Sequence, residues 1–204
     1  MAKSYLSKLY IMNYDYFIIH GTDLKRLYNI LKEGKIYANK YIDKKFIRLA
    51  GWERLPYVYT NIFFNDLQNI ETSFGISLIL HPKILYEQVS IFNEKWQVHP
   101  TEESIYLNPF DGKKSIDEKL NLIKLKISKN LNEKNKVLQI MNHELLFIAR
   151  ICLDDYLIGI LCPGCNMNEI IKIQNLLKKY KYENVKIFDH GGVSLISNII
   201  IKNQ

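Results

Sequence analysis

The feature that most constrains this sequence is an apolar run that leads almost directly into a short amphipathic helix. The run predicts a buried strand over residues 15–19, and His20, Gly21 and Thr22 follow it. Leucine and isoleucine residues then recur at helical spacing as far as Gly34, which is placed to end the helix in the left-handed conformation. A histidine at the mouth of a strand, beside a glycine that lets a ligand approach the backbone, is typical of a small-molecule site.

Length and composition favour one folded domain. The chain has 204 residues, of which 48% are hydrophobic, enough for one well-buried core without requiring a second. We therefore expect a single domain over residues 1–204. The longest apolar runs are too short to cross a bilayer, and the first residues lack the apolar core of a secretory signal. Three cysteines, which cannot all pair with one another, fit a reduced setting, so we expect a cytoplasmic protein with no membrane partner.

The net charge of +7 allows two interpretations. An excess of positive charge favours a polyanionic partner such as DNA or RNA. The lysines are scattered, however, and a chain rich in Lys, Ile, Asn and Tyr is also what an AT-rich genome produces. Charge alone leaves both interpretations open.

The order of the predicted elements favours an α+β fold. Further strands are predicted at residues 56–64, 76–80, 185–188 and 193–200. Helices are predicted at residues 115–129 and 167–180, with a short one after Pro82. Two apolar runs joined by Asp154-Asp155 predict a hairpin over residues 143–161. The pattern is weak over residues 87–108, where irregular structure is predicted around Trp96. Strands cluster without strict alternation with helices, which is typical of a mixed α+β domain.

Three positions carry the chemistry together. They are His20 after the first strand, Tyr59 with Thr60 in the second, and Glu144 at the start of a later one. This order resembles the His-Tyr-Glu triad of the poly(ADP-ribose) polymerase and diphtheria-toxin branch of the ADP-ribosyltransferase superfamily. The resemblance extends over most of residues 15–190. It implies a single domain with split mixed β-sheets flanked by helices, and it implies NAD as the substrate.

The resemblance gives each residue a role in cleaving NAD between nicotinamide and ribose. Glu144 is the catalytic residue, because a carboxylate stabilises the oxocarbenium-like transition state and binds the ribose 2′-hydroxyl. An imidazole bonds an adenosine-ribose hydroxyl, which suits His20, and the backbone of Gly21 reaches the carboxamide. The ring of Tyr59 stacks on nicotinamide, and the hydroxyl of Thr60 bonds its amide.

Further NAD-binding residues are expected around the triad. Thr22 completes the His-Gly-Thr motif of the NAD site. Arg48 and Arg54 lie in the connection before the tyrosine strand, where the family often covers its ligand, and charge-assisted bonds to the NAD pyrophosphate suit them. The equal alternative is a solvated basic loop that packs through Trp52.

The predicted activity is that of a mono-ADP-ribosyltransferase that releases nicotinamide and uses no metal. The acceptor is open among a protein side chain, a nucleic-acid base and water. Asn142, two residues before Glu144, stands where arginine- and guanine-modifying toxins often carry Gln or Glu, so arginine is not assigned. One alternative function is an inactive module that binds NAD or another nucleotide. Another is an RNA 2′-phosphotransferase-like enzyme, for which only His20 is in place.

Cys162-Pro-Gly-Cys165 allows a zinc, redox or structural interpretation. A structural zinc site needs four ligands, and the sequence has no second Cys-x-x-Cys motif. The motif also lies near the C-terminus, rather than after an early strand as in thioredoxin-like proteins. We therefore expect a turn between a strand and a helix.

Overall fold

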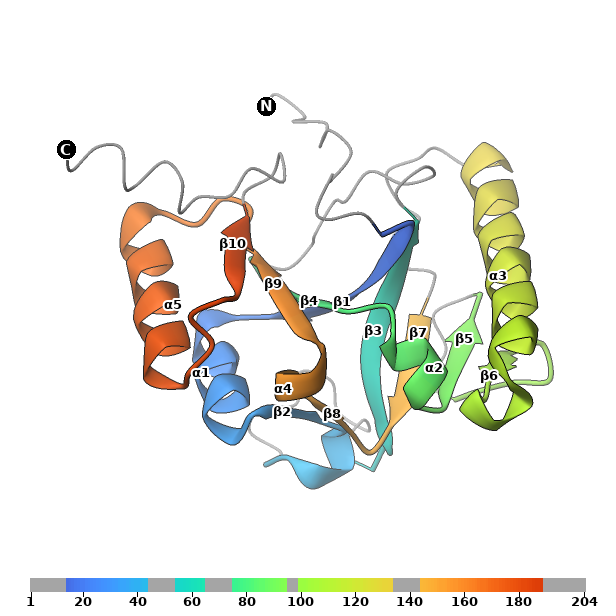
Figure 1. The fold of residues 1–204 in the computed structure, drawn as a ribbon, viewed down its shortest axis with the longest axis horizontal. Coiled ribbons are helices and arrows are strands. Elements are labelled where there is room, and N and C mark those ends of the chain that lie inside the picture. Colours follow the sequence, from blue (N-terminus) through green and yellow to red (C-terminus); the bar gives the residue numbers. More distant parts are fainter. Residues whose placement is uncertain (1–13, 44–53, 65–74, 95–98, 134–143, 189–204) are drawn as a thin grey trace. The chain divides into compact units, whose positions relative to one another are not determined.

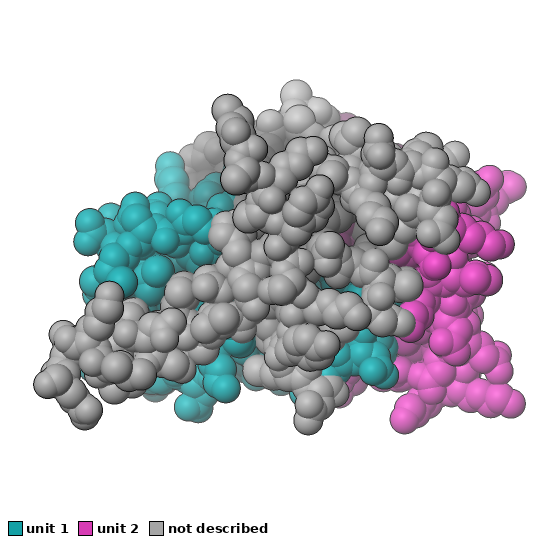
Figure 2. Space-filling view, turned by 90° about the horizontal axis from the view of Figure 1, so that it is seen from above, with its two compact units in different colours: residues 1–34, 63–81, 153–204 teal, residues 35–62, 82–152 magenta. Residues whose placement is uncertain are grey.

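The structure is a computed structural model that describes residues 14–43, 54–64, 75–94, 99–133 and 144–188 (Figure 1). The chain divides into two compact units, coloured separately in Figure 2. Unit 1 comprises residues 1–34, 63–81 and 153–204, and unit 2 comprises residues 35–62 and 82–152. Within the described residues, no helix is long and apolar enough to cross a membrane.

Unit 1 is built on four strands in the order β10-β9-β4-β1. Its elements are β1 (Tyr16–Thr22), α1 (Leu24–Glu33), β4 (Ile76–Leu80), α4 (Leu153–Tyr156), β9 (Leu157–Leu161), α5 (Met167–Lys179) and β10 (Lys186–Phe188). The β1–β4 and β4–β9 pairs are antiparallel and the β9–β10 pair is parallel, so the sheet is mixed. Helices α1 and α5 lie side by side (Figure 1), where the rings of Tyr28 and Tyr180 meet edge to face.

The ends of the two unit 1 helices follow from their sequences. The side chain of Asp23 accepts a hydrogen bond from the backbone N–H of Arg26 at 2.9 Å, which caps the start of α1. Gly34 ends this helix with φ 63°, as predicted. Helix α5 begins with a capping box in which Asn166 and Glu169 each bond the other's backbone N–H. Both helices were predicted within one or two residues of their observed ends.

Unit 2 is built on four antiparallel strands in the order β3-β7-β5-β6. Its elements are β2 (Lys35–Tyr37), η1 (Asn39–Tyr41), β3 (Tyr57–Phe64, of which 63–64 belong to unit 1), α2 (Ile84–Glu87), β5 (Ser90–Asn93), β6 (Ile105–Leu107), η3 (Pro109–Asp111), α3 (Lys113–Glu133), β7 (Glu144–Ile148) and β8 (Arg150–Cys152). Strands β5 and β6 lie in the region where the sequence pattern is weak and predicted no strand, whereas Trp96, around which irregular structure was predicted, lies outside the described residues. Both strands are too short to show a clear alternation of apolar and polar residues.

The predicted hairpin over residues 143–161 is also wrong. Strand β7 pairs with β3 and β5, whereas β8 pairs with β2, and β9 pairs with β4 and β10. Ala149 separates β7 from β8, so the strands with which the chain pairs change at this residue. Ala149 is a non-glycine residue with φ 68°. Its backbone N–H donates to the carbonyl of Pro56 at 2.9 Å, and its carbonyl accepts from Ala38 at 2.8 Å. Asp154 and Asp155 lie in the one-turn helix α4 instead of a hairpin turn.

The described chain has the expected mixed α+β fold, with mixed and antiparallel sheets flanked by helices. Aliphatic and aromatic side chains are buried in each unit, and the largest fully buried ones include Phe17 in unit 1 and Phe92 and Phe147 in unit 2. The predicted strand over residues 193–200 lies outside the described residues. The extent of the domain, residues 1–204, stays a prediction.

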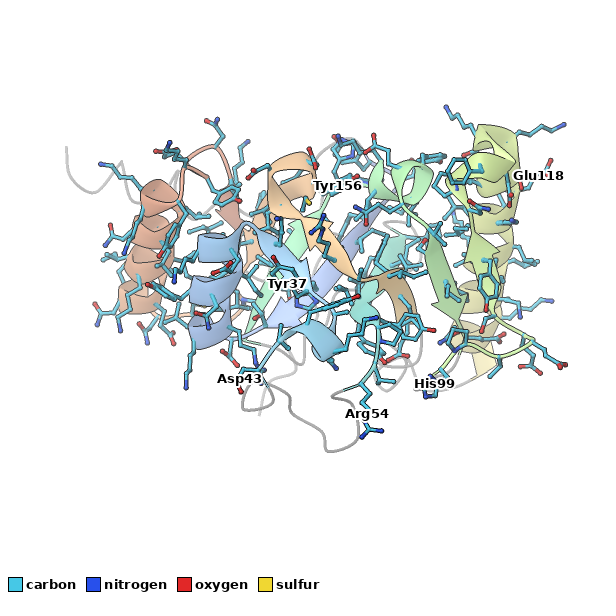
Figure 3. The ribbon with its side chains drawn as sticks, turned by 90° about the horizontal axis from the view of Figure 1, so that it is seen from below. Tyr37, Asp43, Arg54, His99, Glu118 and Tyr156 are labelled. Carbon is cyan, nitrogen blue, oxygen red and sulfur yellow. A yellow bond between two sulfur atoms is a disulfide. The ribbon has the colours of Figure 1, made fainter. Side chains whose placement is uncertain are left out.

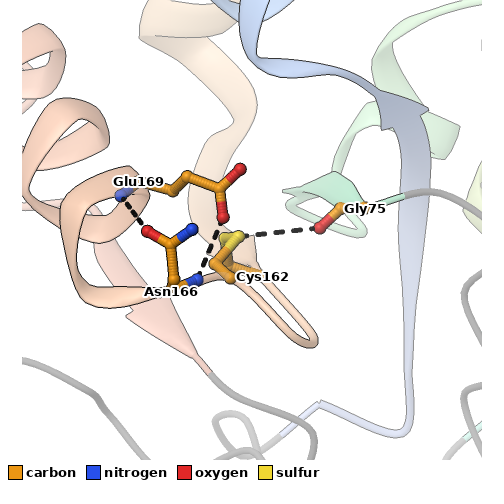
Figure 4. The surroundings of a disulfide bond; sticks show 5 residues. Gly75, Cys162, Asn166 and Glu169 are labelled. Carbon is orange, nitrogen blue, oxygen red and sulfur yellow. Dashed lines mark hydrogen bonds between the residues drawn. A yellow bond between two sulfur atoms is a disulfide. The ribbon is translucent and has the colours of Figure 1, made fainter.

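Cys162 and Cys165 lie in the turn between β9 and α5, as predicted, but they form a disulfide (Figure 4). The expectation of reduced cysteines is therefore wrong for this pair. The thiol of Cys152 is free. The backbone N–H of Cys162 donates to the carbonyl of Phe188 at 2.8 Å, which joins the turn to β10. The contacts of this pair are those of a structural turn.

Candidate functional site

The His-Gly-Thr motif lies inside β1 instead of after it. Strand β4 continues the pairing to the end of the motif, with His20 opposite Leu78 and Thr22 opposite Ile76. Gly21 lies between them, opposite Ser77. The side chain of Thr22 is buried, and its hydroxyl has no hydrogen-bond partner in the described part of the chain. The motif is thus a strand segment of unit 1 with a buried hydroxyl near its end.

Tyr59 and Glu144 share one face of the unit 2 sheet. Tyr59 on β3 is opposite Leu146 on β7, and Glu144 precedes Leu146 by two residues. Side chains two residues apart on a strand, and side chains directly opposite on paired strands, point to the same face. Tyr57, Tyr59 and Asn61 on β3 alternate with buried residues and are half-buried themselves, so this face of β3 is the more accessible one.

The electrostatics agree with the strand register. Burial raises the pKa of the Tyr59 phenol above the ordinary value for tyrosine, and the negative charge of Glu144 raises it further. Tyr57 adds a smaller effect in the same direction. The phenol of Tyr59 is therefore neutral at physiological pH and lies within the field of the Glu144 carboxylate. A neutral, half-buried ring beside a buried carboxylate suits a ligand in which an aromatic group is attached to a carbon that gains positive charge during the reaction.

Thr60 is not on the same face as this pair. It is the next residue along β3 and lies opposite Leu145. Its buried hydroxyl donates its single proton to the carbonyl oxygen of Leu145 at 2.7 Å. This hydrogen bond links β3 to β7. The structure therefore keeps Thr60 apart from Tyr59 and Glu144, and its predicted bond to the nicotinamide amide stays a prediction.

The two arginines are not part of the described pair either. Arg48 lies outside the described residues, as does Trp52, so both interpretations of that connection stay open. Arg54 is exposed in a turn before β3, and its side chain extends away from the ribbon (Figure 3). Its role at a pyrophosphate stays a prediction. Among the residues that the structure describes, no group of three or more His, Cys, Asp or Glu side chains is arranged to hold a metal.

The sequence missed two polar residues that adjoin Glu144. Asn93 ends β5 directly opposite Glu144, and both side chains are buried, with 2% and 5% of their surface exposed. The hydroxyl of Ser104 donates to Oδ1 of Asn93 at 2.6 Å. The one signal in the sequence is a polar residue directly after the apolar pair Ile91-Phe92, which alone does not indicate a site.

Comparison with solved structures finds the same fold in another protein. DarT of Thermus sp. 2.9 in complex with NAD+ matches with a TM-score of 0.53 and 12% identity over 87% of this chain and 96% of that one. The same protein in complex with ADP-ribosylated ssDNA matches with a TM-score of 0.52 and 9% identity, over 85% and 92% of the two chains. These likenesses show that the chain has an ADP-ribosyltransferase-like fold.

Sequence comparison finds relatives closer in sequence. Uncharacterized protein R11 of Acanthamoeba polyphaga mimivirus is 32% identical over 190 residues, which cover 84% of this chain and 69% of that protein. A family model described as a family of unknown function (DUF5846) matches residues 12–134. The matched region contains His20 and Tyr59 but ends before Glu144. Because this model matches more than half of the chain, the chain belongs to the DUF5846 family.

Proposed function

We propose that this protein is an NAD-dependent mono-ADP-ribosyltransferase of the His-Tyr-Glu type. The observation that carries the proposal is the placement of Tyr59 and Glu144 on one face of paired strands, with the carboxylate raising the pKa of the phenol. The fold shared with a protein solved in complex with NAD+ supports NAD as the substrate. The His-Gly-Thr segment supports it independently, because it places an imidazole beside a glycine backbone in the last residues of β1.

The proposed reaction breaks the bond between the nicotinamide nitrogen and C1′ of the ribose. Nicotinamide leaves as a neutral molecule and takes the bonding electron pair, and the ribose becomes oxocarbenium-like. The carboxylate of Glu144 stabilises this positive charge. The ring of Tyr59 stacks on the nicotinamide, while His20 and Gly21 hold the adenosine ribose and the carboxamide. A nucleophile of the acceptor then bonds C1′ and loses its proton.

We propose nucleic acid as the acceptor. The net charge of +7 favours a polyanion, and one of the solved structures with this fold contains ADP-ribosylated ssDNA. A protein side chain and water are the competing acceptors. Because a positively charged protein binds nucleic acid more weakly as salt rises, modification of the acceptor should fall with ionic strength, whereas hydrolysis to free ADP-ribose should not.

The experiment uses NAD labelled in its adenylate group, with single-stranded DNA, RNA or a protein extract as acceptor. Nicotinamide release and the fate of the label are measured together. Label in nucleic acid confirms both the activity and the acceptor. Label in protein or in free ADP-ribose confirms the activity and overturns the acceptor. Saturable NAD binding without any release of nicotinamide overturns the activity and leaves the inactive binding module.

A further inference from the structure

A row of polar side chains crosses the unit 2 sheet where β5 and β7 meet. Glu144 begins β7, Asn93 ends β5 opposite it, and Ser104 immediately precedes β6. Directly opposite side chains on antiparallel strands lie on the same face, with their Cβ atoms within about 5.5 Å. The next two pairs between β5 and β7 are apolar, because Leu146 is opposite Ile91 and Leu145 is opposite Phe92. The polar row is therefore a local feature of the site and does not belong to a generally polar strand.

Hydrogen bonds fix the amide group of Asn93. The hydroxyl of Ser104 accepts a hydrogen bond from the backbone N–H of Thr101 at 2.8 Å and donates its own proton to Oδ1 of Asn93 at 2.6 Å. The hydroxyl has a single proton, and donating it to Oδ1 assigns the carbonyl end of the amide to Ser104. The NH2 end of the amide is thus the end that Ser104 leaves available.

The NH2 group of the Asn93 amide, Nδ2, is buried and has no hydrogen-bond partner among the described residues. The whole residue is 2% exposed. A buried donor without an acceptor destabilises the protein, so such groups are uncommon and are often explained by a ligand or an ordered water. Here the donor belongs to the same row as the carboxylate that we place at the reacting ribose.

We propose that Asn93 binds the substrate, donating from Nδ2 to the same ribose hydroxyl that donates to Glu144. A hydroxyl both donates and accepts, so one oxygen satisfies the carboxylate and the amide together. Ser104 is a positioning residue, because it acts only through the amide of Asn93. This inference rests on the proposed function, since it takes NAD as the ligand and the 2′-hydroxyl of its nicotinamide ribose as the shared group.

The test is a double-mutant cycle with ligands that cannot react. Two ligands are used, carba-NAD+ and the form of it that lacks the 2′-hydroxyl on the nicotinamide side (the 2′-deoxy form). Their affinities are measured by calorimetry on wild type and on a variant that combines Asn93→Leu with Ser104→Ala. The double substitution removes both ends of the bond, so that no new buried polar group is stranded. We expect the variant to bind carba-NAD+ about three- to tenfold more weakly. We expect the 2′-deoxy form to bind wild type and variant equally within about twofold.

Two further variants separate binding from structure. Asn93→Asp keeps the acceptor for Ser104 and loses the donor, so its affinity should depend less on the 2′-hydroxyl than that of wild type, with only the bond to Glu144 left. Ser90→Ala is the matched control, because Ser90 is buried on the same strand and its hydroxyl likewise lacks a partner among the described residues. This control should leave both affinities within about twofold of wild type.

The outcomes distinguish this inference from the proposed function. If wild type binds carba-NAD+ and the variant loses the same affinity for both ligands, Asn93 acts only on structure and the inference is overturned. The same holds if a bridging water satisfies Nδ2, because the variant then keeps the full wild-type difference in affinity between the two ligands. If wild type does not bind carba-NAD+ at all, the proposed function itself fails.

Discussion

Tyr59 and Glu144 lie on neighbouring strands, offset by two residues in the register, and the carboxylate acts on the phenol through space. One residue supplies an aromatic surface and the other a buried negative charge. A planar ligand resting on the first therefore feels the field of the second. The predictions below begin with this pair and then turn to the backbone that supports it.

Glu144→Gln keeps the shape of the side chain and removes its charge. Loss of one electrostatic stabiliser typically lowers kcat by about 10²–10³. NAD affinity should change far less, because the carboxylate acts mainly on the charge that develops during the reaction. Nicotinamide release and NAD affinity are measured on both forms, with Glu118→Gln on the exposed face of α3 (Figure 3) as the control. Equal turnover by wild type and Glu144→Gln would remove Glu144 from the mechanism.

Tyr59→Phe should reduce the loss of stability in alkali. The folded state raises the pKa of Tyr59 above its unfolded value of 10.0 by burial first and by Glu144 second. Between those two pKa values the folded protein binds more protons than the unfolded one, so the free energy of unfolding falls as pH rises above about 10. Urea denaturation at pH 8 and at pH 10.5 measures the effect. Tyr106→Phe, on an exposed residue of β6, is the control, and an unchanged pH dependence in Tyr59→Phe would contradict the prediction.

Ala149→Gly should stabilise the protein, although it removes a methyl group. A left-handed backbone costs an L-residue about 1–2 kcal/mol, and φ of Ala149 is 68°. The added freedom of glycine in the unfolded chain offsets about 0.4–1 kcal/mol of that gain. Ala149→Val should destabilise, because a β-branched side chain fits this conformation poorly. Thermal unfolding of the two variants should move in opposite directions, and a stabilising valine would show that the strain is absent.

Cys162→Ser with Cys165→Ser should change stability little and activity not at all. The disulfide closes a loop of only a few residues, for which chain entropy predicts at most about 2 kcal/mol. Denaturation of wild type with and without dithiothreitol should show that difference, and the double variant should show none. Nicotinamide release that depends on the redox state in wild type but not in the double variant would give the pair a functional role instead.

The sequence predicted the elements whose signals are local. Helices α1 and α5 have both an apolar period and capping residues, and β3 has a run of aromatic and β-branched residues, so their positions follow from propensity and pattern. Strands β5 and β6, with four and three residues, carry no comparable signal. The hairpin prediction failed because two apolar runs close in sequence pair with different strands, a choice that tertiary packing makes.

In the candidate site, too, local signals could be predicted from the sequence, whereas pairing between distant strands could not. His20, Tyr59 and Glu144 were predicted from their order, residue type and resemblance to a known triad, and their roles stay a prediction. The pairing of Asn93 with Glu144 joins residues 51 positions apart through a strand register, which no local pattern encodes. The face of Thr60 likewise depends on the register of β3 and β7, so its separation from Tyr59 needed the structure.

The short strand β6, which follows Ser104, determines how easily this part of the site opens by local unfolding. β6 has three residues, and in the described sheet of unit 2 it pairs with β5 alone. Short edge segments open by local unfolding at a lower free energy than central strands such as β7. Amide hydrogens of β6 should therefore exchange with solvent before those of β7. Each such opening would release the Asn93 amide while the strand that carries Glu144 stays folded.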